Sequence, residues 1–179
     1  MHGMIVAELQ NYANTRHGPG AWTTLLQKAN LTGRVYLANL DYPDADAISL
    51  MMAASAMTGL PVSAVLEDFG QFIVPAIMAT YGHLLQPQWT ALDVIENTEA
   101  TVHSVVRVRN PGATPPKLST RRVSPNEVLL VYTSPRRMCG LAIGIATGIG
   151  QHFHETIVAT QTMCMHKGAT HCEIVFRVE

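Results

Sequence analysis

Residues 102–136 read VHSVVRVRNPGATPPKLSTRRVSPNEVLLVYTSPR, and the rest of the chain is arranged around this stretch. It begins in a segment that we expect to be helical despite its β-branched residues, and it ends in the extended sequence YTSPR. Two turns marked by proline and one short strand lie between. His103 lies on the helical part, where a neutral imidazole can bind a metal such as haem iron. Taken alone, His103 is better explained as a histidine with only a structural role in its helix.

Three polar side chains stand at alternate positions at the end of the stretch. Side chains alternate between faces in an extended segment, so Tyr132, Ser134 and Arg136 can share one face. Two hydroxyl groups and a forked guanidinium suit a pair of carboxylates such as the two propionates of haem. The exposed polar face of an ordinary strand would show the same pattern.

Four features occur together in one known family: His103 in its helix, the sequence GATPP at 112–116, the Tyr132-x-Ser134-x-Arg136 pattern and the opening MHGMIV at 1–6. On these features the chain resembles the haem nitric oxide/oxygen-binding (H-NOX) domains of bacterial gas sensors and soluble guanylate cyclase. Spacing and order match along nearly all of the chain. The resemblance implies one domain over 1–179, with a helical lobe at about 1–60 and a sheet lobe at about 61–179. Haem b would be buried between the lobes.

The resemblance also implies how the haem would be held. His103 is expected to ligate the iron, while the tyrosine, serine and arginine of the pattern bind the propionates. In the family the proline at the position of Pro116 presses on the porphyrin and helps to bend it. Ile5 is expected to contact the opposite side. Alternatively, Pro116 is only a turn residue, since Pro-Pro is typical of an extended connector.

The distal side of the implied haem pocket bears on gas selectivity. Oxygen-binding members of the family place a tyrosine there as a hydrogen-bond donor, and the corresponding residue here is Leu141. A pocket without a donor does not stabilise bound oxygen, whereas nitric oxide and carbon monoxide depend far less on such a bond. The further apolar candidates for the distal wall are Val6, Leu9, Ile73, Ile77 and Ile145.

A second group of metal-binding side chains lies near the end of the chain. Its members are Cys139, Cys164, Cys172, His166 and His171. Soft thiolates with one imidazole suit tetrahedral zinc. Some family members hold zinc in this region, but their histidine ligand lies where this chain has Gln161. The fourth ligand would therefore be His166 or His171, and three reduced, partly buried thiols are the alternative.

The periodicity of apolar residues indicates an α+β fold with helices first and an antiparallel sheet after them. The expected helices cover residues 4–17, 22–29, 45–57, a segment from 63 that Pro75 must kink or divide, two helices after residue 90, and 138–153. The expected strands cover 118–123, 127–133, 156–163 and 172–178. Candidate helix caps are Asp44, Ser63, Thr90, and Asn97 or Thr98. Gly140, Gly144 and Gly148 share one helix face, which predicts close packing on the sheet.

Composition restricts the class of protein. The chain of 179 residues is 47% hydrophobic and 14% charged, which fits the lining of an internal apolar pocket or a large partner surface. A net charge of -1 without a basic run argues against binding to nucleic acid or anionic membranes. The start lacks the pattern of a signal peptide. Three cysteines, an odd number, argue against a disulfide framework, and the apolar run at 138–149 is too short to span a bilayer. We therefore expect a cytoplasmic protein.

These observations favour a sensor module over an enzyme. In the family, nitric oxide weakens the bond between iron and histidine, the haem relaxes, and the two lobes shift. Bacterial members usually signal to a histidine kinase or a cyclic-di-GMP enzyme, so such a partner is expected. The alternatives are a cysteine or zinc redox switch and a haem-free regulatory module of the same fold. A haem enzyme is disfavoured because the distal candidates are apolar and include no acid-base pair.

Overall fold

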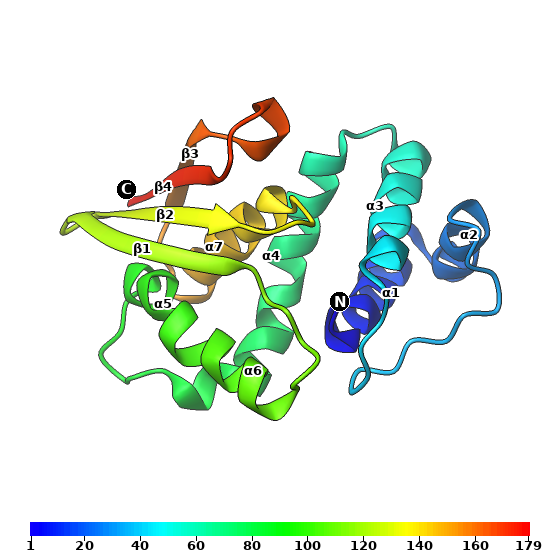
Figure 1. Ribbon diagram of the computed structural model, residues 1–179, viewed down its shortest axis with the longest axis horizontal. Helices are drawn as coiled ribbons and strands as arrows, with labels where there is room; N and C mark the ends of the chain where they lie inside the picture. Colours follow the sequence, from blue (N-terminus) through cyan, green and yellow to red (C-terminus); the bar gives the residue numbers. More distant parts are fainter.

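The first half of the chain is helical and the second half carries the sheet (Figure 1). The computed structural model describes residues 1–179. The helices are α1 (Gly3–His17), α2 (Ala21–Lys28), α3 (Asp44–Thr58), α4 (Val62–Tyr81), α5 (Ala91–Asn97), α6 (Ser104–Arg109) and α7 (Cys139–His152). Two 3-10 turns cover Gly82–Leu84 and Met165–Lys167, and a π-helical turn, Glu99–His103, joins α5 to α6.

The sheet is antiparallel throughout and contains β1 (Lys117–Ser124), β2 (Glu127–Thr133), β3 (Ile157–Met163) and β4 (Cys172–Val178) in the order β1-β2-β4-β3. Alternate residues of β2 and β4 are buried, because α5 and α7 pack on one face of the sheet. Leu118 pairs with Tyr132, and Tyr132 pairs with Cys172. The predicted α+β fold is confirmed, and each predicted strand agrees with the observed one to within a residue or two.

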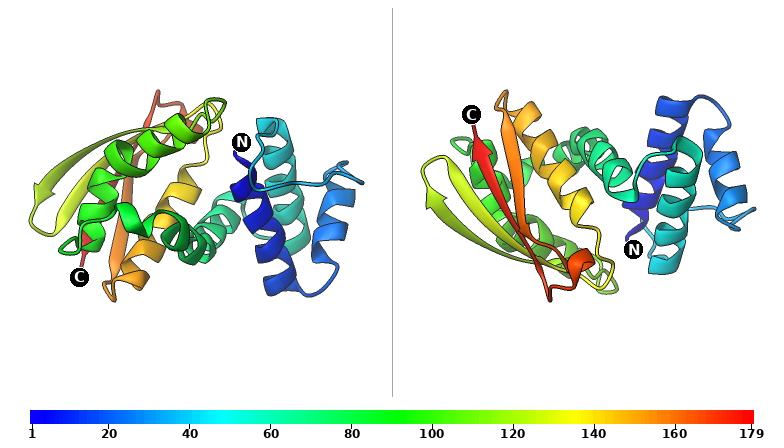
Figure 2. Two further views of the ribbon diagram at one scale, coloured as in Figure 1. Left: turned by 90° about the horizontal axis from the view of Figure 1, so that it is seen from below. Right: turned by 90° about the horizontal axis from the view of Figure 1, so that it is seen from above.

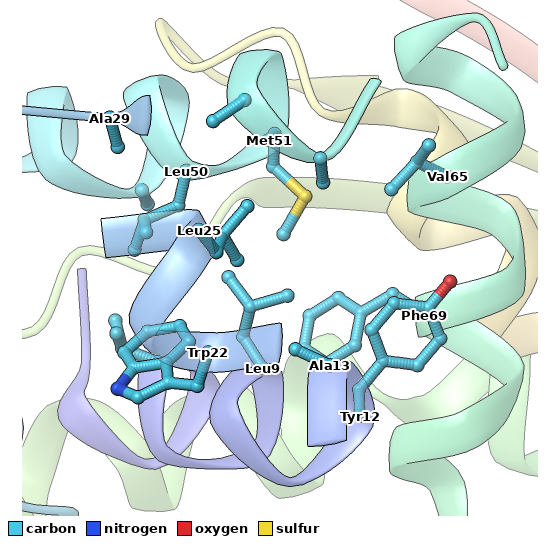
Figure 3. Packing of buried hydrophobic residues seen from close by; sticks show 14 of the residues in the cluster. Leu9, Tyr12, Ala13, Trp22, Leu25, Ala29, Leu50, Met51, Val65 and Phe69 are labelled. Carbon is cyan, nitrogen blue, oxygen red and sulfur yellow. The ribbon is translucent and has the colours of Figure 1, made fainter. Parts of the chain in front are cut away.

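Two hydrophobic cores lie on either side of α4. The first joins α1, α2 and α3 to one face of α4 and includes Leu9, Tyr12 and Phe69 (Figure 3). The rings of Tyr12 and Phe69 have their centroids 5.5 Å apart and are tilted by 59°. The second core lies between the sheet, α5 and α7, and Val74 of α4 belongs to it. Both views in Figure 2 place α4 between the N-terminal helices and the sheet.

Glycines bring the backbones of α4 and α7 into direct contact. A Cβ added to Gly70 of α4 would lie 2.7 Å from the Leu141 carbonyl oxygen of α7, and one added to Gly144 would overlap the backbone of Glu67. The glycine face of α7 thus packs on α4, not on the sheet as the sequence predicted. The sequence predicted that Pro75 would kink or divide its helix. Pro75 lies inside α4, which runs from Val62 to Tyr81, so a division does not occur.

Helix α4 also contains the most membrane-like segment of the chain. Together with the turn that follows, Val62–Leu84 is long and apolar enough to cross a bilayer by length and composition alone, with a mean hydropathy of 1.4. A core helix passes the same test. Here Phe69 and Val74 are buried in the two cores, and about a third of the tested segment, 33%, is buried in the structure.

One predicted helix cap is confirmed. Thr90 and Asp93 form a capping box at the start of α5, in which each side chain accepts a hydrogen bond from the backbone N–H of the other. The cap predicted at Asn97 or Thr98 is wrong, because Thr98 has helical backbone angles and its hydroxyl donates to the Val94 carbonyl at 2.7 Å. The helical path therefore runs on toward His103.

The caps predicted at Asp44 and Ser63 are wrong as well. Helix α4 begins at Val62, which places Ser63 inside its first turn. Asp44 is the first residue of α3 rather than its cap, and its carboxylate makes contacts outside the helix. Pro43 and Pro61 occupy the two cap positions, where neither forms a side-chain hydrogen bond.

The contact between α4 and α7 leads to a prediction about stability. Gly144→Ala should lower the free energy of unfolding by about 1–3 kcal/mol, because the added methyl group meets backbone that cannot move aside. Gly82→Ala is the matched control, since a Cβ there meets nothing within 4 Å. Urea unfolding of the two variants tests this. Equal stabilities would show that the two helices can separate without cost.

Candidate functional site

A cavity of about 230 Å³ is lined by 29 residues, of which 22 are hydrophobic. Met1 and Ile5 line it from the N-terminal lobe, and Ile77, Leu141 and Ile145 line it from α4 and α7. Residues of the segment 94–118, of β2 and of β4 complete the wall. Mainly apolar concave sites with a few polar groups are typical of sites for small molecules and cofactors.

His103 lines this cavity at the end of the π-helical turn. Its backbone N–H donates to the Thr98 carbonyl, five residues back, at 3.0 Å. Its side chain is 14% exposed, and Nδ1 lies 2.9 Å from Oε2 of Glu99. An ionised carboxylate only accepts hydrogen bonds, so this contact places the ring proton on Nδ1 and leaves the lone pair of Nε2 free to bind a metal.

The electrostatics of this pair favour a neutral histidine beside a charged glutamate. Burial lowers the pKa of His103, and the hydrogen bond to Glu99 offsets only part of that effect. Burial raises the pKa of Glu99, but hydrogen bonds from His103, Arg107 and the Leu118 N–H outweigh it and hold this pKa below its usual value. The sequence analysis missed Glu99. The spacing of four residues between Glu99, His103 and Arg107 is the signal that would have found it.

The Tyr132-x-Ser134-x-Arg136 pattern comes together at the edge of the cavity. Tyr132 and Arg136 line the cavity, whereas Ser134 is buried beside them and accepts a hydrogen bond from the Arg136 backbone N–H at 3.3 Å. Burial raises the pKa of Tyr132, so its phenol stays protonated and is able to donate. The guanidinium of Arg136 binds both carboxylate oxygens of Asp44 at 3.0 and 3.1 Å, and it also donates to the Thr114 carbonyl.

Asp44 joins the N-terminal lobe to this pattern, a role that the sequence analysis did not assign to it. Its carboxylate accepts from the Met1 ammonium at 2.8 Å as well as from Arg136. The Met1 ammonium also donates to the Tyr42 carbonyl at 2.6 Å. The start of the chain, α3 and the segment between β2 and α7 therefore meet at one carboxylate.

The apolar candidates divide into two groups. Pro116, Ile5, Ile77, Leu141 and Ile145 all line the cavity, as the sequence analysis expected of such a wall. The other three do not line it and are instead fully buried in the first core: Val6, Leu9 and Ile73. Their apolar character serves packing, a role that periodicity does not distinguish from lining a pocket. Tyr81 of α4 also lines the cavity and was missed.

The three cysteines form a separate cluster in which the Sγ atoms of Cys139, Cys164 and Cys172 all lie within 4.8 Å of one another. Burial raises the pKa of Cys172 to about 12, while backbone hydrogen bonds lower the pKa of Cys164 against the opposing effect of burial. A metal bound here would deprotonate these thiols.

Neither candidate histidine belongs to the cysteine cluster. Nε2 of His166 lies 2.6 Å from the Arg137 carbonyl, and His171 contacts Thr170 and Glu173. The sequence-based assignment of His166 as a fourth ligand is therefore not reproduced. The cluster that the structure brings together consists of three thiols.

The Haem-NO-binding family model matches residues 2–161. The chain belongs to this family. Its fold is similar to an H-NOX protein from S. oneidensis in the Fe(II)NO state, with a TM-score of 0.92, 25% identity, and coverage of 100% of this chain and 99% of the other. An H-NOX domain from Shewanella oneidensis in the Fe(II)CO state gives a TM-score of 0.88 at 25% identity, with coverage of 100% of this chain and 99% of the other. No curated protein matches the chain.

A more distant H-NOX structure shows the same fold. The I5F mutant from T. tengcongensis has a TM-score of 0.86 and 18% identity, and the match covers 100% of this chain and 98% of the other. The residues of the cavity fit the haem of the family in three respects. The wall is largely apolar, His103 offers a free imidazole nitrogen, and Tyr132 and Arg136 supply donors at one edge.

The ion pairs of Asp44 lead to a prediction about pH. Burial raises its pKa, but the Met1 ammonium and Arg136 outweigh burial and lower it below the usual value. A lowered pKa stabilises the fold above about pH 4, the ordinary value for Asp, and this contribution is lost as pH falls through the folded-state pKa. Asp44→Asn should thus be less stable than wild type at pH 7, and the gap should close below about pH 4. Urea unfolding across this range tests it, and a gap independent of pH would contradict it.

Proposed function

We propose that this chain is a haem-based nitric oxide sensor, in which His103 ligates ferrous haem b and the signal passes to a separate protein. The observation that carries the proposal is the His103 imidazole, which lines an apolar cavity and has its Nδ1 bonded to Glu99 at 2.9 Å. Membership of the Haem-NO-binding family and the Fe(II)NO and Fe(II)CO states of the relatives support it. When bound, haem supplies an iron that coordinates nitric oxide or carbon monoxide.

The polar edge of the cavity would hold the propionates. The guanidinium fork of Arg136 is 8% exposed and is fixed in place by Asp44 and Thr114. Tyr132 keeps its proton and can donate one hydrogen bond. Ser134 is buried and orders the backbone at Arg136, so its proposed contact with a propionate is the least direct of the three.

The apolar wall would determine which gases bind. Ile5, Leu141 and Ile145 offer no hydrogen-bond donor, so they would exclude water and give no support to bound oxygen. Pro116 lies in the wall within the segment that joins α6 to β1, where it would contact the porphyrin. Ile5, Leu141 and Ile145 carry no titratable group for acid-base chemistry, and we propose a sensor and not an enzyme.

The lobes would carry the signal. We propose that the chain divides into a helical lobe and a sheet lobe at about residue 60. Helix α4 contributes residues to both hydrophobic cores. Release of the contacts of Ile5 and Pro116 would change how α1 packs against the sheet lobe. The arrangement of the two lobes would then have two states, and the bound ligand would favour one of them. A cytoplasmic histidine kinase or cyclic-di-GMP enzyme is the proposed class of partner.

Absorption spectra of the reduced protein test the gas selectivity. The haem band should shift with nitric oxide and with carbon monoxide but remain unchanged in air. Leu141→Tyr should give a response to oxygen, because it adds a donor to the wall. Leu141→Phe is the matched control, because it adds the ring without the hydroxyl, and it should behave as wild type. A wild-type spectrum that responds reversibly to oxygen would contradict the proposal.

Variants of His103, the proposed iron ligand, test the ligand assignment by the same spectra. His103→Ala should lose the haem band unless imidazole is added, because the substitution removes the nitrogen that is proposed to ligate the iron. His152→Ala, at the end of α7, should retain it. Retention of an unchanged spectrum by His103→Ala would remove His103 as the ligand.

The cysteine cluster supports a second candidate function, a metal or thiol redox site that acts beside the haem site. Three Sγ atoms within 4.8 Å of one another suit a soft metal such as zinc, with a fourth ligand from outside the cluster. Protein purified without an affinity tag should contain about one zinc per chain, and Cys172→Ser should lose it while His166→Ala retains it. Zinc well below one per chain in the wild type would leave three reduced thiols and remove this candidate.

A further inference from the structure

Glu99 is the acidic side chain that contacts the His103 imidazole. The two residues stand four apart, at the two ends of the π-helical turn, and Oε2 of Glu99 lies 2.9 Å from Nδ1 of His103. His103 is 14% exposed and Glu99 is 29% exposed, so solvent screens this contact only in part. A carboxylate at this distance from a ring nitrogen makes a charge-assisted hydrogen bond.

Two further donors fix the carboxylate in place. Nη2 of Arg107 lies 2.6 Å from Oε1, and the backbone N–H of Leu118 donates to Oε2 at 3.1 Å. Leu118 belongs to the edge strand β1 and follows Pro116 by two residues. Glu99 thus ties the histidine both to its own helix and to the segment that contains Pro116.

We propose that Glu99 is a positioning residue that orients the His103 imidazole and strengthens Nε2 as a donor toward iron. A hydrogen bond from Nδ1–H to a carboxylate fixes the tautomer and the ring orientation, and it increases the basicity of the opposite nitrogen. The inference rests on the proposed haem function and deepens it. In the proposed sensor, a stronger bond between iron and His103 would oppose the weakening of that bond by nitric oxide, so Glu99 would set the sensitivity of the switch.

A purely structural role for Glu99 is the competing explanation. The carboxylate would then serve only to join Arg107 and Leu118, and its loss would lower stability without altering the imidazole. The two explanations differ in one respect, the electronic state of the His103 ring. Spectroscopy of that ring therefore separates them.

The test uses Glu99→Gln and Glu99→Ala, with Glu96→Gln as the matched control. Glutamine retains the shape and the acceptor oxygen but loses the charge, whereas alanine removes both. Glu96 lies one helical turn earlier, and its carboxylate bonds Arg122 at 2.9 Å rather than the histidine. All four proteins are reconstituted with haem and reduced.

Resonance Raman spectroscopy then gives the stretching frequency of the bond between iron and histidine. We expect the frequency to fall from wild type to Glu99→Gln and further in Glu99→Ala, with Glu96→Gln equal to wild type. Affinity for haem should fall by about 10- to 100-fold in Glu99→Ala, the usual effect of removing such a partner. In the haem-free proteins, nitrogen-15 NMR should find the ring proton on Nδ1 in wild type and a shift toward Nε2 in Glu99→Ala.

The outcomes distinguish the proposed haem function from the proposed role of Glu99. A wild-type chain that takes up no haem would overturn the proposed function, and the NMR measurement would still decide whether Glu99 holds the tautomer. A set of haem-loaded proteins with one common stretching frequency would overturn the role of Glu99 alone. If Glu99→Ala fails to fold, Glu99→Gln decides, because it preserves the shape of the side chain.

Discussion

The direct contact between the backbones of α4 and α7 is the constraint on which the rest of the structure depends. Gly70 and Gly144 allow this approach, because a Cβ at either position would meet the backbone of the other helix. Helix α4 contributes Phe69 to one hydrophobic core and Val74 to the other, so its position fixes both cores. The cavity is formed where Ile77 of α4 and Leu141 of α7 face the N-terminal and sheet segments. A looser helix pair would change the shape of that wall.

Carboxylates fix the polar ends of an otherwise apolar cavity. Asp44 holds Arg136 from the N-terminal lobe, and Glu99 holds His103 from within its own helix. In both pairs the acidic residue lies behind the side chain that lines the cavity, and further donors fix the acid in turn. The functional side chains are therefore held in place before any ligand binds, which reduces the free energy spent on ordering them.

Local patterns predicted the strands and the main helices, because alternation and helical spacing are properties of neighbouring residues. His103, Tyr132 and Arg136, which line the cavity, were singled out by the resemblance to a family, since each pattern alone also fitted an ordinary helix or strand. The partners across the fold were not predictable in this way. Asp44 and Arg136 are 92 residues apart, and nothing near Asp44 distinguishes an ion pair from a helix cap. Ile73 has the composition of a pocket wall but lies in a core, because helical spacing does not specify which neighbour a face meets.

The π-helical turn before His103 makes the number of residues in this segment as informative as their identity. A π turn accommodates one more residue than an α turn, and such turns are often found at functional sites. Deletion of a single residue between Glu99 and His103 would turn the bond from the His103 N–H to the Thr98 carbonyl into an ordinary α-helical one. Glu99 would then stand three residues before the histidine instead of four, so this residue count sets the contact between the two side chains. Among natural variants of this chain, insertions and deletions should accordingly be accepted in the loop between α2 and α3 far more readily than in this one turn.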